Sequence, residues 1–325
     1  MGFQTKTLLL SFAITIVLGF IIVPILKKLK VGQIERDDGP ESHLKKQGTP
    51  TMGGIIIMLG IGIVTIAAYI YYRTVDVELA RNLLPILGLT IGFGAIGFID
   101  DFKKLVLKNT KGLKPSLKML GLLIISVVYI IYLIKGLNLG TDTYIPILKE
   151  YVNIPIYAYI PFAILVILAT TNAVNLTDGI DGLSSSVCTI IITCLTIIAT
   201  TLGVKEIVIF GAIVIGAVLG FLMFNIHPAK VFMGDTGSLF LGGVISGIAL
   251  YLKIPLILLL IALIPVIETL SVIIQVTYFK KTGKRIFKMA PLHHHFELSG
   301  WKENKVVIIF SITTLIVCMI GLKII

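Results

Sequence analysis

Long apolar runs, separated by short polar or glycine-containing segments, dominate the chain. A membrane-spanning helix needs about 20 mostly apolar residues, and this pattern predicts about ten such helices. The predicted spans are residues 7–26, 53–72, 83–99, 119–134, 156–173, 183–202, 207–224, 237–252, 256–279 and 305–322. The first run lacks a small-x-small cleavage site, so we interpret it as a retained span. Without internal repeats or low-complexity linkers, residues 1–325 are expected to form a single all-α integral membrane domain.

Composition excludes a soluble enzyme. The chain is 56% hydrophobic and only 14% charged, with a mean hydropathy of +1.01, whereas soluble domains average roughly 45–50% apolar and about 25% charged residues. Its three cysteines, Cys188, Cys194 and Cys318, all lie within apolar runs. Their positions favour neither a disulfide framework nor a metal cluster.

The basic residues behind the net charge of +11 are concentrated on one side of the predicted membrane. Of the 28 lysines and arginines, 20 fall in alternate loops. These loops are residues 27–52, 100–118, 174–182, 225–236 and 280–305. By the positive-inside rule they are cytoplasmic, which places both termini outside. We interpret the basic excess as topology plus contact with anionic membrane lipid, and not as nucleic-acid binding.

The acidic residues are more informative than the basic ones. Five aspartates lie at the predicted cytoplasmic ends of spans: Asp100, Asp101, Asp178, Asp181 and Asp235. Carboxylates kept so close to hydrocarbon usually mark a site. These five residues come from three loops on one face, so we expect them to form one cluster. Such a cluster needs a counter-ion, and Mg²⁺ with a phosphate-bearing substrate is suited to that role. For Glu268, inside the ninth span, a functional role and a simple hydrogen-bonding role both stay open.

Two of the motifs carry paired aspartates. In FIDDFKK (98–104), Asp100 and Asp101 point about 100° apart on a helix, so they are expected to have different roles; an ordinary charged helix end is the alternative. In NAVNLTDGIDGL (172–183), Asp178 and Asp181 are three residues apart and are accompanied by glycines that allow tight turns and close ligand approach. The ligand scheme of an EF-hand is not satisfied, and we interpret this segment as a binding loop.

Three further motifs have features of phosphate sites. Asp235, in FNIHPAKVFMGDTGS (224–238), precedes a span, where it caps a helix or contributes to a phosphate site, or both. MAPLHHHFE (289–297) lacks the HExxH pattern, so its histidines favour phosphate contact or support of a metal site. KKQGTPTMGG (45–54) is a basic, glycine-rich entry to a span, although it is no Walker A loop, and a plain helix-start turn is the alternative.

Together these motifs resemble the polyprenyl-phosphate N-acetylhexosamine-1-phosphate transferase superfamily and, within it, the phospho-N-acetylmuramoyl-pentapeptide transferase (MraY, translocase I) family. The segments APLHHHFE (290–297) and GTPTMGG (48–54) carry most of the likeness, which covers nearly the whole chain. The resemblance implies a Mg²⁺-dependent reaction on the inner face of the bacterial plasma membrane. UDP-N-acetylmuramoyl-pentapeptide and undecaprenyl phosphate would give UMP and lipid I in peptidoglycan synthesis. It also implies a homodimer.

The resemblance further implies roles for individual residues. Asp235 would be the metal ligand, Asp100 the base or carrier-phosphate positioner, and Asp101 and His294 part of the same catalytic centre. Phe232 would stack on uracil, and Asp181 would accept its imide N–H. The complete set of expected substrate-binding residues is Lys46, Thr51, Lys104, Asn175, Asp178, Gly179, Asp181, Asn225, Phe232, His293 and His295.

Two other functions compete with this interpretation. A sister transferase would move N-acetylglucosamine-1-phosphate, but the histidine string is associated with the muramoyl enzymes. A secondary transporter predicts acidic residues near the bilayer midplane and repeated halves. Here the aspartates lie at the edge of the spans and no halves repeat, which disfavours transport.

Overall fold

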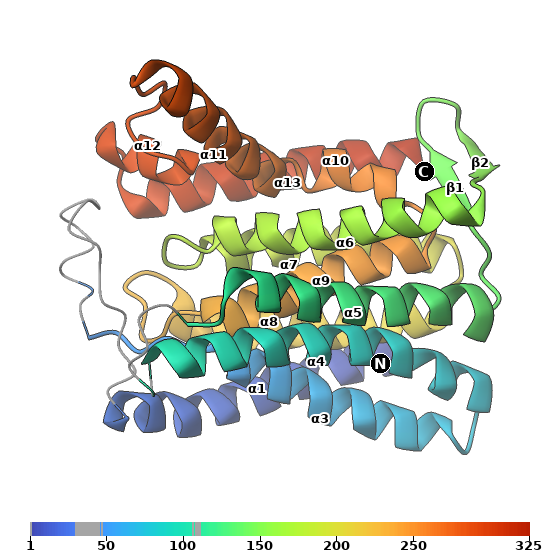
Figure 1. Cartoon of the computed structure of the whole chain (residues 1–325). Coiled ribbons are helices and arrows are strands. Elements are labelled where there is room, and N and C mark those ends of the chain that lie inside the picture. Colours follow the sequence, from blue (N-terminus) through green and yellow to red (C-terminus); the bar gives the residue numbers. More distant parts are fainter. Residues whose placement is uncertain (1, 30–45, 47, 106, 108–111) are drawn as a thin grey trace.

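The computed structural model describes residues 2–29, 46, 48–105, 107 and 112–325 (Figure 1). Parts of the predicted loops 27–52 and 100–118 therefore lie outside the described residues. Within the described part, nine helices are long and apolar enough to cross a membrane. They are α1 (Phe3–Lys28), α3 (Gly54–Tyr72), α4 (Val77–Leu105), α5 (Pro115–Ile131, extended by a π-helical turn to Gly136), α6 (Ile156–Thr177), α7 (Leu183–Thr201), α8 (Lys205–Asn225), α11 (Leu263–Thr282) and α13 (Glu303–Ile324). The expected all-α membrane fold is confirmed.

The eighth expected span, 237–252, is helix α9 (Gly234–Tyr251), which is not among these nine. Every residue of α9 from Thr236 to Tyr251 is buried inside the protein. Because α9 packs against other helices on all sides, it contains glycine and serine where a lipid-facing helix would carry large apolar residues. Asp235, in its first turn, is thereby placed at the centre of the bundle's end.

The predicted span 256–279 is interrupted. A 3₁₀ turn (Pro255–Ile257) and the short α10 (Leu258–Ile261) precede α11, and Ala262 separates α10 from α11. Pro265 lies in the first turn of α11, where its missing N–H costs no helical hydrogen bond. Figure 1 shows α11 inclined to the other helices and projecting from the bundle together with α12 (Leu292–Leu298).

In helix α1 the buried face carries mostly small or polar residues and the exposed face carries large apolar ones, the reverse of a helix in a soluble protein. Its buried residues, which recur about every four positions, are mostly small or polar: Thr7, Ser11, Thr15, Gly19, Val23 and Leu26. The large side chains face outward, as Phe20 does with 68% exposure. Small residues allow close helix packing in a membrane, whereas large apolar residues suit contact with lipid.

A two-stranded hairpin and both termini share one end of the bundle. Strands β1 (Asp142–Ile145) and β2 (Glu150–Asn153) are antiparallel, with Asp142 opposite Asn153. The Tyr144 hydroxyl donates a hydrogen bond to the carbonyl of Ile324 at 2.8 Å, which places the C-terminus beside the hairpin. At the N-terminus, Phe3 stacks on Tyr71 near the end of α3. The start of α3 and the start of α9 lie at the opposite end.

Candidate active site

Two loops and two close helix contacts bring the start of α9 into place. The segment before α3 pairs with the segment before α9, because Phe232 N donates to the Pro50 carbonyl and Gly53 N donates to the Phe232 carbonyl, both at 2.8 Å. Helix α4 approaches so closely that a Cβ on Gly97 would lie 2.2 Å from the Asp235 carbonyl oxygen. A Cβ on Gly54 would lie 2.1 Å from Gly237 N. Only glycine permits this packing around Asp235.

Asp235 has polar partners from three other elements. Its Oδ2 lies 2.6 Å from the Lys118 ammonium and 3.3 Å from that of Lys104. Its Oδ1 accepts a hydrogen bond of 2.8 Å from the Asn175 side chain, which also donates to the Ser238 hydroxyl. We define the Asp235 centre as these groups and the neighbouring carboxylates: Asp100, Asp101, Lys104, Lys118, Asn175, Asp178 and Asp235.

The two adjacent aspartates of α4 have different surroundings, although both are buried. Asp100 is 2.8 Å from Lys104, 3.3 Å from Lys118, and accepts a 2.7 Å hydrogen bond from Leu113 N. Asp101 instead accepts hydrogen bonds from the backbone and hydroxyl of Thr236, at 2.9 and 2.6 Å. Asp100 therefore contacts the lysines, while Asp101 holds the start of α9.

Asp178 ends α6 and faces the same centre. Burial and the negative charges of Asp235 and Asp101 raise the pKa of Asp178 to about 8, against a partial offset by a hydrogen bond from the Gly234 backbone. The centre thus contains more carboxylates than its two lysines neutralise. A bound cation would relieve this repulsion.

A second polar group, which we call the Lys46 cluster, consists of Lys46, Asp181, His227 and Glu303. The Lys46 ammonium lies 2.7 Å from Asp181 Oδ1 and 2.5 Å from Glu303 Oε1. Glu303 Oε1 also accepts a 2.6 Å hydrogen bond from Asp181 N. Burial lowers the pKa of Lys46, but the hydrogen bonds and charges of the two carboxylates outweigh it and leave the pKa raised.

This cluster is also a candidate metal-binding group. One ligand atom from each of Asp181, His227 and Glu303 lies within 4.8 Å of the others. His227 Nδ1 is 3.1 Å from Asp181 and 3.2 Å from Glu303. Because the Lys46 ammonium already contacts both carboxylates, it supplies the positive charge that a metal would otherwise supply.

Three other expected substrate-binding residues surround these two groups. Phe232 is partly exposed, and its ring centroid is 5.9 Å from the Lys46 ammonium. Thr51 and Asp101 flank Gly234. Gly179 packs directly against the His293 ring, where a Cβ would lie 2.1 Å from Nε2. Phe232 and Thr51 thus adjoin the two groups, whereas Gly179 packs on the buried His293 ring.

Asn225, another expected substrate-binding residue, is held by hydrogen bonds within the protein. It is buried, accepts a 2.7 Å hydrogen bond from the Ser185 hydroxyl and donates one of 3.1 Å to the Val231 carbonyl. Both ends of its amide are used within the protein, so in this structure it braces the loop that presents Phe232.

The three consecutive histidines have three different environments. His293 is fully buried, and its backbone N–H and Nδ1 both contact Glu268, at 3.2 and 3.1 Å. Its side chain therefore lies beneath the protein surface, held by Glu268. His294 Nδ1 is 3.1 Å from Glu297, and His295 Nδ1 accepts a hydrogen bond from Lys288 N. Of the two roles that the sequence left open for Glu268, these contacts with His293 correspond to the hydrogen-bonding one.

Sequence reasoning did not single out Lys118, His227 or Glu303. Lys118 falls among the charges that indicate topology, and an acidic residue opening a helix, such as Glu303, is usually explained by the helix dipole. His227 lies inside the recognised motif 224–238 but has no distinguishing spacing. Only the tertiary contacts identify these three residues.

Carboxylates and lysines that meet at one end of a membrane bundle are suited to binding phosphate groups and a cation. The chain matches the family described as Glycosyl transferase family 4 over residues 83–253. Fold and site thus define a membrane-embedded transferase.

More specific likenesses narrow the family. Residues 46–58 match phospho-N-acetylmuramoyl-pentapeptide-transferase signature 1. The chain is 49% identical over 315 residues to the phospho-N-acetylmuramoyl-pentapeptide-transferase of Acetivibrio thermocellus, covering 96% of this chain and 92% of that protein. It is 50% identical to that of Clostridium botulinum strain Eklund 17B (97% and 94%) and 47% identical to that of Halalkalibacterium halodurans (97% and 95%). The chain belongs to the phospho-N-acetylmuramoyl-pentapeptide transferase family.

Proposed function

We propose that the protein transfers phospho-N-acetylmuramoyl-pentapeptide from UDP-N-acetylmuramoyl-pentapeptide to undecaprenyl phosphate, giving lipid I and UMP. The reaction would take place on the cytoplasmic face of the bacterial plasma membrane, with both termini outside. The observation that carries this proposal is the Asp235 centre, where carboxylates and two lysines from separate elements meet at the end of a membrane bundle.

The lysines of this centre supply charge for phosphate chemistry. In the proposed reaction, an oxygen of the carrier phosphate attacks the sugar-proximal phosphorus of the donor, and the bond to UMP breaks. Lys104 and Lys118 would stabilise the negative charge on the reacting phosphates. The attacking phosphate is already largely ionised near pH 7, so Asp100 is better suited to holding these lysines than to removing a proton.

Mg²⁺ fits the donor set, since this hard cation prefers oxygen ligands and the centre has more carboxylates than lysines. Asp235 would hold the ion, which when bound acts as a Lewis acid that polarises phosphoryl oxygens. Asp101 and Thr236 fix the backbone at Asp235 through hydrogen bonds of 2.6–3.3 Å. They therefore position the carboxylate itself.

An apolar groove along α6 supports a lipid acceptor. It has a volume of about 300 Å³ and lies between α6 and the segment 255–270. Its lining extends along α6 to Ala173, near the helix end that carries Asn175, which contacts Asp235. Residues two apart on a helix do not face the same way, so the groove lies on another face of α6 from Asn175. A prenyl chain in this groove would bring its phosphate to the end of α6 at which the Asp235 centre lies.

The direct test is UMP release by detergent-purified protein. We expect release only when donor, undecaprenyl phosphate and Mg²⁺ are all present, and we expect a chelator to stop it and added Mg²⁺ to restore it. Release of UMP without the lipid acceptor would contradict transfer, and full activity in excess chelator would contradict the metal.

Replacing Phe232 by alanine tests the nucleotide subsite. Stacking of a base on an aromatic ring contributes about 1–3 kcal/mol, so we expect the KM for the nucleotide donor to rise about tenfold with a smaller change in kcat. Phe20→Ala, a lipid-facing change on α1, is the control and should leave both constants unaltered. An unchanged KM in Phe232→Ala would remove the stacking role.

A further inference from the structure

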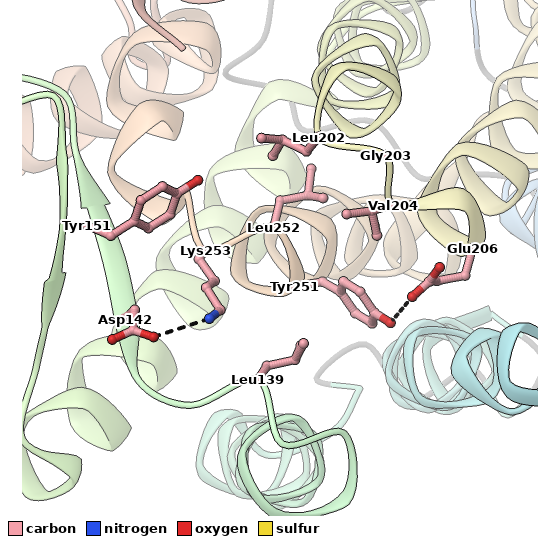
Figure 2. Close-up of a pocket in the computed structure, with 10 residues that line it drawn as sticks. All are labelled: Leu139, Asp142, Tyr151, Leu202, Gly203, Val204, Glu206, Tyr251, Leu252 and Lys253. Carbon is pink, nitrogen blue, oxygen red and sulfur yellow. Dashed lines mark hydrogen bonds and ion pairs between the residues drawn. The ribbon is translucent and has the colours of Figure 1, made fainter.

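A cavity of about 520 Å³ lies at the end of the bundle opposite to Asp235 (Figure 2). Asp235 is in the first turn of α9 and Tyr251 is its last residue. At about 1.5 Å per residue they are about 24 Å apart along the helix. The cavity is bounded by the hairpin, the loop between α7 and α8, and the end of α9. It is thus separate from the Asp235 centre.

Glu206 is the carboxylate on one wall of this cavity. Its Oε1 accepts hydrogen bonds from the Tyr251 hydroxyl at 2.5 Å and from the Asn82 side chain at 3.3 Å. Both donors are neutral. Among the described residues, no lysine or arginine nitrogen lies within 4.0 Å of the Glu206 carboxylate. Within the part of the chain that the structure describes, its charge is therefore not paired with a cationic side chain.

The opposite wall already contains a balanced ion pair. The Lys253 ammonium lies 3.2 Å from Asp142 Oδ2, and Figure 2 shows this pair across the cavity from Glu206. Two carboxylates and one ammonium leave the lining with a net charge of one negative. A cationic ligand complements such a lining, whereas a purely anionic ligand would be repelled by Glu206.

We propose that this cavity binds a primary ammonium group at the Glu206 carboxylate. Glu206 would accept a charge-assisted hydrogen bond from the ammonium, and the Tyr151 side chain, which also lines the cavity, offers a further aromatic contact. Leu139, Leu202 and Leu252 provide an apolar wall for the rest of the ligand.

The position of the cavity indicates two sources for such an amine. Helix α7 ends at Thr201 and α8 begins at Lys205, and both helices are long and apolar enough to span the membrane. The cavity thus lies at the depth of the lipid headgroups. An aminophospholipid would direct its ammonium to Glu206 and its phosphate toward Lys253, while a small free amine would use Glu206 alone.

Binding to the purified full-length protein tests this site, with phosphatidylethanolamine, phosphatidylglycerol and free ethanolamine as probes in native mass spectrometry. We expect selective retention of phosphatidylethanolamine over phosphatidylglycerol, and at least about tenfold weaker binding in Glu206→Gln, because a hydrogen bond to a charged group is lost. Glu150→Gln, an exposed change on β2 outside the lining, should bind as the wild type does.

The outcomes separate the two sources. Competition by free ethanolamine would support an amine site open to both, and lipid binding without such competition would assign the site to the lipid. Binding of ethanolamine alone would assign it to free amines. Equal retention of both lipids, undiminished binding in Glu206→Gln, or no binding of any probe would overturn the proposal. Glutamine still accepts the Tyr251 hydrogen bond, so an unchanged thermal midpoint and unchanged UMP release confirm that the variant is folded.

Discussion

Replacing Asp235 by asparagine is expected to reduce UMP release by at least about 10²-fold while the protein stays folded. The change removes the negative charge that lies 2.6 Å from Lys118 and 3.3 Å from Lys104, together with the proposed metal ligand. The fold should survive, because the backbone hydrogen bonds from Asp235 and Thr236 to Asp101 do not use the replaced side chain. Initial rates of UMP release at saturating substrates measure the loss.

Asp76→Asn is the matched control for this variant. Asp76 is exposed at the far end of α4, where its Oδ1 accepts a hydrogen bond from Leu79 N, and an asparagine oxygen retains that role. This variant should have wild-type activity. Wild-type activity in Asp235→Asn would contradict the assignment of Asp235. A lower midpoint of thermal unfolding in Asp235→Asn, but not in Asp76→Asn, would indicate a structural role for Asp235.

Replacing Gly97 by alanine is the second change with a large expected effect. An added methyl group would lie 2.2 Å from the Asp235 carbonyl oxygen and 2.7 Å from Thr236 N. These are backbone atoms, so the start of α9 must move away from α4. A misplacement of about 1 Å at a reacting group costs about 10²-fold in rate. We expect a loss of this size in kcat, measured per folded protein.

Gly88→Ala provides the comparison within the same helix. A Cβ on Gly88 meets nothing within 4 Å, and alanine is intrinsically better than glycine inside a helix by about 1 kcal/mol. We expect full activity and an equal or higher thermal midpoint from this variant. If Gly97→Ala were as active as Gly88→Ala, the close approach of α4 to α9 would not be needed for the reaction.

The fold was predicted to the extent that hydrophobicity determines it. Nine expected spans are helices that meet the criteria for crossing a membrane, because lipid contact requires long apolar runs. The break at Ala262 and the hairpin at 142–153 were not predicted. Both involve contacts with distant segments: Tyr144 N of the hairpin donates to the Lys253 carbonyl, and the Cys318 thiol donates to the Ile261 carbonyl beside the break.

The site was predictable where residue type alone indicates chemistry. Carboxylates beside hydrocarbon are conspicuous, and the structure groups Asp100, Asp101 and Asp178 around Asp235. Asp181 instead belongs to the neighbouring Lys46 cluster. Contacts made across more than 100 residues have no local signal, and for this reason Lys118 and Glu303 were overlooked. The burial of His293 and Asn225 was not predicted for the same reason, since it depends on contacts with Glu268 and Ser185, which lie far away in the sequence.

The central claim, transfer of a phospho-N-acetylmuramoyl group, is tested most directly by the choice of donor. Detergent-purified protein is supplied with undecaprenyl phosphate and Mg²⁺, and UMP release from UDP-N-acetylmuramoyl-pentapeptide is compared with that from UDP-N-acetylglucosamine. We predict turnover of the muramoyl donor only. Turnover of only UDP-N-acetylglucosamine would retain the superfamily but contradict the substrate, and no turnover of either donor by folded protein would contradict the proposed activity itself.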